Sequence, residues 1–507
     1  MEQLSTLEYL KLNKLNKIWY KLKCFFFGIP GWFVAFFKGL WEKIKKLGLK
    51  IWENIVDIGV TFKNGSWKTR VSFFVMGFGN IMFGQWLRGI VFFAFEVIFI
   101  LYMALAGGYW LSKFGTLGTK LPHKEMHPVL DVETFVRGDN SFKILLYGLL
   151  TIMFIVAFVY TWRLNVKQCK TCESIVASGK KVKSTKDDVK SLIDDEFHKT
   201  LLALPVTGII VFTVLPIIFM ILVAFTNYDA SNPGNGYGNL FTWVGFENFN
   251  TLLDFGGGNK FTFGEILAWT LMWAFFATFT NYFLGMFVAM MINKKGIKIK
   301  KFWRTVLVLT IAIPQFISLL YVSNLFSKNG IINATLMKWG WTNKPLPFWE
   351  NGTLARAMVI IINIWIGIPY LMLITTGILM NIPQDLYEQA RIDGANVWQQ
   401  YVKITLPYML FVTGPYLLTS FVGNINNFNV IFLLTGGGPA NADLVVDGQA
   451  AGDTDLLITW LFNLTTGATN NYKLASVIGI LIFLVVAVLS LIVYRILPSN
   501  RREGDFS

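Results

Sequence analysis

The chain has 507 residues, of which 54% are hydrophobic and only 15% charged, with a mean hydropathy of +0.52 and a formal net charge of +15. Soluble domains carry about 25% charged residues, so this composition excludes an ordinary soluble protein. The basic residues lie between apolar blocks of about 20 residues, the length of a membrane-spanning helix, which indicates membrane orientation and not nucleic-acid binding.

Residues 1–70 mix Lys with Trp, Phe, Leu and Ile, and their apolar runs are short and interrupted by charge. This pattern predicts amphipathic helices that lie on the inner membrane surface, with Lys close to anionic headgroups. A cytoplasmic helical hairpin is the alternative. Since no compact apolar run is followed by a small-residue cleavage site, we expect no signal peptide.

Eight apolar stretches are long enough to cross a bilayer as helices. They lie at roughly 87–109, 143–162, 201–226, 266–291, 304–326, 356–380, 408–434 and 475–496. The stretch 71–86 is apolar but short and rich in Gly, which is typical of a re-entrant or interfacial piece. We therefore predict an all-α polytopic transmembrane bundle of about eight spans, two N-terminal and six in a core.

Basic residues in short loops mark the cytoplasmic side of a membrane protein. The 163–199 loop has nine and the 293–304 loop has six, whereas the 227–264 and 437–474 loops have one each. This alternation predicts a multi-pass protein of the bacterial cell membrane with both termini in the cytoplasm. The 110–142 loop fits least well, because it has four basic residues on the outer side.

The segment 381–407, between the sixth and seventh spans, reads NIPQDLYEQARIDGANVWQQYVKITLP. Pro383 and Asp385 suit the first turn of a helix, Gly394 allows a sharp turn, and Pro407 ends a second short helix. An amphipathic helix–Gly–helix unit needs a partner groove to bury its apolar face. A loop that packs against its own bundle is the alternative.

This segment resembles the coupling loop, or EAA loop, of ABC-importer permeases. The matching residues are Glu388, Gln389, Ala390, Gly394, Ile404, Leu406 and Pro407, with Gln389 standing where Ala is usual. The resemblance implies that the segment contacts an ATPase subunit. The residues expected to carry that coupling are Glu388, Ala390, Asp393, Gly394, Leu406 and Pro407.

The resemblance extends over about 300 residues. Stretches 243–253, 302–318, 362–373, 424–439 and 451–465 are similar to the larger, MalF-like permease subunit of binding-protein-dependent maltose and maltodextrin importers. This implies alternating-access import of maltodextrin-type oligosaccharides. The large outer domain of that family between the first two core spans is missing, which suits a membrane-tethered binding lipoprotein.

The implied partners are a second permease subunit, two nucleotide-binding ATPase subunits and an extracellular sugar-binding protein or lipoprotein. We expect ATP and Mg²⁺ on the ATPase subunits and no cofactor on this chain, which has no GxxxxGK[ST] phosphate loop and is not expected to be an enzyme. The expected divisions are surface helices at 1–70, an N-terminal transmembrane appendage at 71–162, a cytoplasmic linker at 163–199 and a permease core at 200–507.

Polar residues inside a span are costly and usually face a cavity. In the seventh span, Ser420, Asn424 and Asn427 fall on one face at about 100° per residue, and Thr413 and Tyr416 share that face. The stripe predicts a translocation path, with interhelical hydrogen bonding as the alternative. In the resembling family, the positions that match Ser420, Asn424 and Asn427 contact the sugar.

In the sixth span, Pro369 removes a backbone donor next to Gly367 and Tyr370, a break of the kind found at transporter sites. A packing kink is the alternative. The resemblance implies that Gly367 and Tyr370 contact the sugar. In the fifth span, Ile311 and Gln315 replace a tyrosine and a serine of the family, and the Gln315 amide still hydrogen-bonds hydroxyls.

Glu96 lies within the first span and would be the titrating group of a rival function, an ion-coupled secondary transporter. A carboxyl group satisfied by its neighbours is the simpler interpretation. Cys169 and Cys172 form a CxxC motif without a second pair of ligands, so we expect no metal site. Within the importer class, the alternative substrates are galacto-, raffinose-type or plant-derived oligosaccharides.

Overall fold

The computed structural model describes residues 14–127, 131–182, 184–194, 196–253, 261–294, 296–297, 299–467 and 470–496. Within these ranges, seven helices are long and apolar enough to cross a membrane, or eight if one bent pair counts as a single span. The predicted all-α polytopic bundle is therefore confirmed. Residues 1–13 and the basic tail at 501–502 lie outside the described residues.

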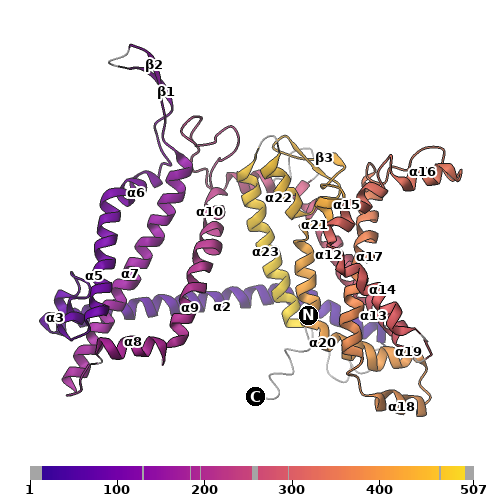
Figure 1. Ribbon diagram of the computed structural model, residues 1–507, viewed down its shortest axis with the longest axis horizontal. Helices are drawn as coiled ribbons and strands as arrows, with labels where there is room; N and C mark the ends of the chain where they lie inside the picture. The colour runs from indigo at the N-terminus through magenta and orange to yellow at the C-terminus, as the bar shows by residue number, and fades with distance from the viewer. Residues whose placement is uncertain are drawn as a thin grey trace. The chain divides into compact units, whose positions relative to one another are not determined.

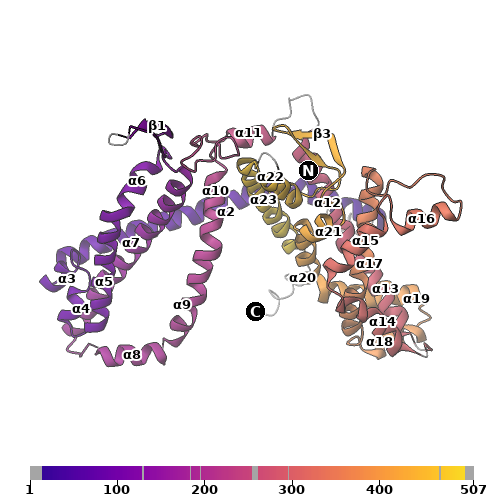
Figure 2. The same cartoon turned by 45° about the horizontal axis from the view of Figure 1, so that its top comes forward.

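The chain divides into two compact units, which we describe separately. Unit 1 comprises Met1–Tyr109 and Leu150–Thr207, and unit 2 comprises Trp110–Leu149 and Gly208–Ser507. The boundaries run through long helices and not through loops, because three apolar helices continue from one unit into the other. Figures 1 and 2 show these helices in two views.

Unit 1 begins with α2, a single helix over Lys14–Asn64, so the hairpin alternative is wrong for this stretch. The short helices α3 (Trp67–Val71) and α4 (Phe78–Met82) follow. The stretch 71–86 consists of short helices and turns, in agreement with its interpretation as a piece too short to span.

The remaining helices of unit 1 include the first two spans. They are α5 (Trp86–Tyr102), η1 (Met103–Gly107), α7 (Ser141–Ala177), which begins in unit 2, α8 (Thr185–Ile193), and α9 (Phe197–Ile209), which ends in unit 2. Helix α6 (Gly108–Phe114) continues the first span into unit 2. Helices α5 and α7 pack through stacked rings of Phe99 and Phe158, whose centroids lie 3.8 Å apart. Helix α7 continues to Ala177, so the first part of the predicted linker is helical.

Unit 2 contains the remaining helices and two short antiparallel hairpins. The helices are η2 (Ile210–Val214), α10 (Leu215–Val223), α11 (Glu247–Leu253), α12 (Thr262–Phe275), η3 (Phe276–Thr280), α13 (Asn281–Asn293), α14 (Lys300–Ala312), α15 (Gln315–Leu325), α16 (Ile331–Lys338), α17 (Gly352–Leu379), α18 (Gln384–Ile392), α19 (Val397–Gln400), η4 (Tyr401–Thr405), α20 (Leu406–Ile425), α21 (Phe428–Leu434), α22 (Leu457–Thr466) and α23 (Tyr472–Ile496). Trp273, Trp460 and Tyr282 are among its largest fully buried side chains.

The two hairpins of unit 2 were not predicted from the sequence. In the first, β1 (His123–Met126) pairs with β2 (Glu133–Val136), and in the second, β3 (Ala440–Val446) pairs with β4 (Gln449–Gly452). Both lie at the end of unit 2 opposite α18 (Figure 1). They are short connections between spans and leave the all-α class unchanged. The first is exposed, whereas Leu444, Val446 and Ala451 of the second are buried in the hydrophobic core of unit 2.

Two predicted spans are not continuous helices. The fifth is broken into α14 and α15, which bend by 89°, so the single helix expected at 304–326 is wrong. Pro314 causes the break, because it forces Ile313 into an extended conformation (φ −82°, ψ 124°). The seventh ends at Ile425, and the separate helix α21 follows, so the single helix expected at 408–434 is also wrong.

Candidate functional site

The first candidate site is the helix–turn–helix formed by α18 and α19. Pro383 precedes α18 as its N-cap, and Asp393 is the C-cap. Gly394 has a φ of +74°, a conformation that L side chains adopt only with strain. The Ala395 amide then donates to the Ala390 carbonyl at 2.8 Å, which closes the end of the helix. The turn predicted at Gly394 is therefore present.

Side chains hold this unit to the start of the next span. The Tyr387 hydroxyl hydrogen-bonds the Thr405 hydroxyl at 2.8 Å, which joins α18 to η4. Asn396 and Gln399 form a capping box that starts α19. These bonds join α18, α19 and the start of the membrane helix α20 into one connected element.

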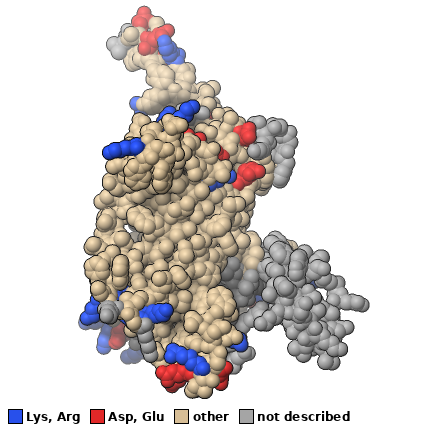
Figure 3. Space-filling view, turned by 90° about the vertical axis from the view of Figure 1, so that its right-hand side faces the viewer, with Lys and Arg blue, Asp and Glu red and all other residues tan. Residues whose placement is uncertain are grey.

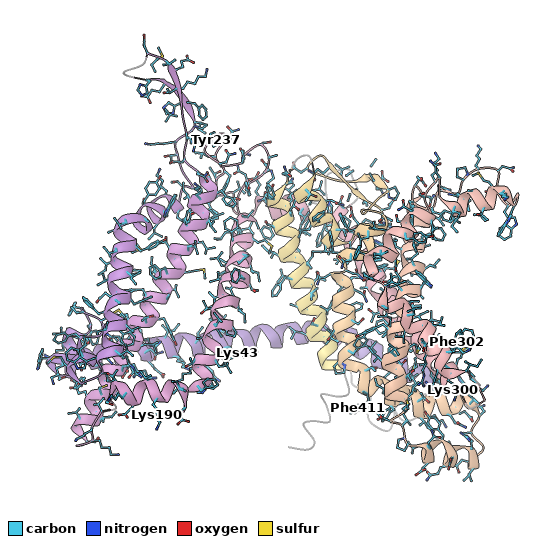
Figure 4. All side chains as sticks on the ribbon, viewed as in Figure 1. Lys43, Lys190, Tyr237, Lys300, Phe302 and Phe411 are labelled. Atoms are coloured by element: carbon cyan, nitrogen blue, oxygen red, sulfur yellow. The ribbon has the colours of Figure 1, made fainter. Side chains whose placement is uncertain are left out.

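The α18–α19 element exposes large apolar side chains to its surroundings. Ile392 is 86% exposed, Val397 83% and Trp398 69%. Charged side chains lie at both ends of the face in Figure 3, one of them the end with α18 and α19, while the broad middle is almost without charge. In Figure 4, Lys300 and Phe302 at the start of α14 lie at this end too. An exposed apolar patch with a charged rim marks an interaction surface.

The second candidate site lies where α20 ends against η3 and α12. The Asn424 amide donates to the Thr278 hydroxyl at 3.0 Å, and its carbonyl oxygen accepts from the Asn427 amide at 3.2 Å. Trp273 Nε1 donates to the Asn424 backbone carbonyl at 3.1 Å. The Asn427 side chain also accepts from the Val430 amide as the N-cap of α21. The structure thus joins Asn424 and Asn427 directly.

A second group of polar side chains lies along the same face of α20. Tyr416 and Ser420 lie one turn apart on α20, and the Tyr416 hydroxyl lies close enough to Tyr370 on α17 for an electrostatic interaction. Tyr370 is 51% exposed, whereas Thr413 is buried and hydrogen-bonds the Tyr282 hydroxyl at 2.8 Å. The face therefore divides into a buried interhelical contact at Thr413 and an accessible cluster of Tyr370, Tyr416 and Ser420.

Gly367 lies against a polar residue that the sequence interpretation missed. A Cβ atom at Gly367 would lie 2.5 Å from Asn281 Nδ2, so α17 and α13 approach closely only because this residue is Gly. The Asn281 side chain is buried and donates to the Ala277 carbonyl at 2.8 Å. Within the described residues, its side-chain oxygen has no hydrogen-bond partner. A polar Asn inside an apolar span was the available signal.

Gln315 is the first residue of α15, directly after the bend at Pro314, and it is exposed. Among the residues that the structure describes, no hydrogen bond joins it to the other five predicted sugar contacts. Ile311, at the end of α14, is 42% exposed. The bend, and not a continuous helix, therefore decides which way these two positions face.

Glu96 is held by the backbone of a neighbouring segment. Its side chain is buried, and one carboxylate oxygen accepts from the Met76 amide at 2.8 Å. Cys169 is also buried and lies 3.3 Å from the Ser72 hydroxyl. Both residues thus hold the stretch 71–86 against the spans of unit 1. No cluster of three or more His, Cys, Asp or Glu side chains suited to a metal is found in the described part of the chain.

A buried carboxyl group organises the loop between α21 and α22. Asp455 accepts from the Gly452 amide at 2.8 Å and from the Asn463 amide at 3.1 Å. Burial raises its pKa to about 6, against the opposing effect of these hydrogen bonds. Gly437, with a φ of +95°, packs directly on this carboxyl group and leaves no room for a Cβ atom.

Comparison with known proteins relates this chain to sugar permeases. Residues 281–503 match the family model of the binding-protein-dependent transport system inner membrane component. The chain is 32% identical to the maltodextrin transport system permease protein MalC of Streptococcus pneumoniae over 432 residues, 83% of this chain and 93% of that one. It is also 32% identical to the galactooligosaccharides transport system permease protein GanP of Bacillus subtilis, over 85% of this chain and 97% of that one.

Other matches cover less of the chain. The maltose/maltodextrin transport system permease protein MalF of Vibrio vulnificus is 35% identical over 260 residues, which are 50% of this chain and 48% of that one. A crystal structure of a bacterial ABC transporter involved in the import of alginate superposes with a TM-score of 0.47 and 23% identity, over 62% of this chain and 98% of that one.

Proposed function

The chain belongs to the family of binding-protein-dependent transport system inner membrane components, and from this premise we propose that it is a permease subunit of an ATP-driven importer of maltodextrin-type oligosaccharides. It is a multi-pass protein of the cell membrane. The observation that carries the proposal is the exposed α18–α19 element. Its apolar face offers a surface that an ATPase subunit can bind, and its connection to α20 lets it act as a lever on the membrane helix.

The proposed assembly contains this chain, a second permease subunit, two ATPase subunits that bind ATP and Mg²⁺, and an outer sugar-binding protein or lipoprotein. The α18–α19 element docks on an ATPase subunit through Glu388, Ala390, Asp393 and Gly394. Leu406 and Pro407, at the start of α20, transmit the movement. Both termini lie in the cytoplasm, as the Lys and Arg bias of the loops indicates.

The proposed sugar path follows the accessible cluster of Tyr370, Tyr416 and Ser420. Hydroxyl and aromatic groups of this kind hydrogen-bond sugar hydroxyls and stack on sugar rings. Asn424 and Asn427 are proposed to complete the path once their bond to each other opens during alternating access. Gly367 contributes by letting α17 approach Asn281, and Gln315 by placing an exposed amide at the bend.

Relatives named for two kinds of sugar support two substrates. The similarity to a maltodextrin permease favours α-linked glucose oligomers, whereas the equal identity to a galactooligosaccharide permease favours a galactose-containing alternative. Ile311 and Gln315 stand where the resembling family has two hydroxyl side chains. An apolar group and an amide offer a sugar different contacts than hydroxyls do, so these two positions affect which of the two sugars is bound.

Uptake of labelled maltotriose into vesicles that contain the assembled importer tests both the substrate and the path. We expect excess unlabelled maltodextrin to compete better than galactooligosaccharide or raffinose. Ser420→Ala should reduce uptake several-fold, because one net hydrogen bond is worth about 1 kcal/mol. Stronger competition by galactooligosaccharide would identify that sugar as the substrate. Undiminished uptake in Ser420→Ala would contradict the proposed path.

A further inference from the structure

Unit 1 contains a pocket that has no part in the proposed sugar path. It has a volume of about 450 Å³ and lies between α2 and α7. One face of each helix lines it, at helical spacing. The lining residues are Asn54, Asp57, Ile58 and Thr61 from α2, and Arg163, Val166, Lys167, Lys170, Thr171 and Ser174 from α7.

The pocket carries an excess of positive charge. Lys170 is paired with Asp57, with its Nζ 2.5 Å from a carboxylate oxygen. Among the residues that the structure describes, Arg163 and Lys167 have no carboxylate partner within 4.0 Å. The nearby Glu173 is already engaged, since its two oxygens accept from the Ser66 amide and the Thr69 hydroxyl, each at 2.7 Å. Two cations are therefore left to bind an anion.

The pocket lies where the apolar part of α7 ends. Arg163 follows directly on the apolar part of α7, and the residue before it is Trp162, of a type enriched at membrane–water interfaces. This position in the sequence predicts that the pocket lies near the lipid headgroups. On α2, Trp52 is 64% exposed and Ile55 54%. Apolar side chains this exposed suit the boundary with acyl chains and not water.

We propose that this pocket binds the phosphate group of an anionic phospholipid from the inner leaflet. Arg163 supplies a fork of donors that matches phosphate oxygens, and Lys167 adds a second charge. Ile58 lines the same pocket with partly exposed apolar surface, which the glycerol and the upper acyl chain contact, and the buried Val166 lies behind it in the wall. The bound lipid fixes α2 against α7, so that the long N-terminal helix is held at the membrane surface. A free phosphate would need the same cations but not the apolar lining.

Native mass spectrometry of the full chain with its partner subunits, titrated with phosphatidylglycerol and with phosphatidylcholine, tests this inference. We expect selective retention of phosphatidylglycerol. Replacing both Arg163→Gln and Lys167→Gln should weaken it by roughly fivefold for each charge removed. Lys180→Gln with Lys181→Gln, at exposed sites beyond the end of α7, is the matched control and should leave retention unchanged. Arg163→Lys with Lys167→Arg keeps both charges and should keep most of the binding, which excludes misfolding as the cause.

Two results would overturn the proposal. Equal retention of the two lipids, or an equal loss in the Lys180 and Lys181 control, would show that the pocket is not the lipid site. Displacement of phosphatidylglycerol by an equal concentration of glycerol phosphate or inorganic phosphate would show that the site takes a free phosphate and not a membrane lipid.

Discussion

Single polar residues decide where helices stop in this chain. Asn427 was predicted to continue the polar stripe of the seventh span, but its side chain caps α21, and its amide bonds Asn424 across the break. Asn is among the strongest N-cap residues, and several Asn in succession signal a helix end more strongly than a helix face. Asn281, which lies in another span, is paired with Gly367 only by tertiary packing, so the sequence alone could not place the two together.

Asp455 predicts a pH dependence of stability. Its pKa is about 6 in the folded chain against 3.8 for the free side chain, so the folded state binds the proton more readily. The stability contributed by this group therefore rises as the pH falls through 6, by a total on the order of 3 kcal/mol. Asp455→Asn removes the titration. We expect the thermal stability of the natural protein to rise relative to that of the variant as the pH is lowered from about 8 to about 5.

The measurement is the melting temperature of both purified proteins in the same detergent at a series of pH values. Asp443→Asn, at an exposed position on β3, controls for the general effect of removing a carboxylate. A difference between the natural protein and Asp455→Asn that stays constant across the series would contradict the raised pKa.

At the level of elements, the sequence predicts helices well and their breaks poorly. Apolar blocks located the spans because a membrane helix must be apolar over its length. Pro314 bends the fifth span by 89°, whereas Pro205, Pro369 and Pro415 lie inside continuous helices. Packing against neighbouring helices decides whether a proline bends a span or lies within a continuous helix. A single sequence does not show that packing.

The α18–α19 element carries the mechanical prediction. Gly394 has a φ of +74°, and no atom lies within 4 Å of the position that a Cβ would take, so Gly394→Asp adds conformational strain at an open site. We expect this variant to fold and insert, but to lose most sugar uptake and sugar-stimulated ATP hydrolysis, because the strain of about 1 kcal/mol or more redirects α19. Uptake and ATP hydrolysis are measured in the same vesicles.

Gly340→Asp is the matched control, since Gly340 also has a positive φ, of +73°, and open space around it but follows α16 outside this element. A Gly394→Asp variant with natural uptake and stimulation, or an equal loss in Gly340→Asp, would contradict the role of the α18–α19 turn as a lever.

At the scale of the whole molecule, composition and charge were sufficient to predict the structural class of the protein. They predicted a multi-pass bundle, and each of the eight predicted spans overlaps one of the seven continuous spans or the bent pair among the described residues, although the fifth and seventh were expected as single helices with other ends. The division into units was less accessible, because it runs through the helices of the first three spans and depends on long-range packing. The resemblance around Glu388 and Gly394 pointed to the family that the comparisons show, whereas the sugar rests on the names of relatives.

The most direct test of the account is the energy source of transport. Maltotriose uptake is measured in vesicles that contain the chain with its partner subunits and binding protein, with ATP inside or with an imposed proton gradient and no ATP. We predict uptake that requires ATP hydrolysis, does not respond to the proton gradient and is unchanged by Glu96→Gln, since the Glu96 carboxylate is bonded to the Met76 amide and Gln can accept the same hydrogen bond. Uptake that follows the proton gradient without ATP, and is abolished by Glu96→Gln, would contradict the importer assignment.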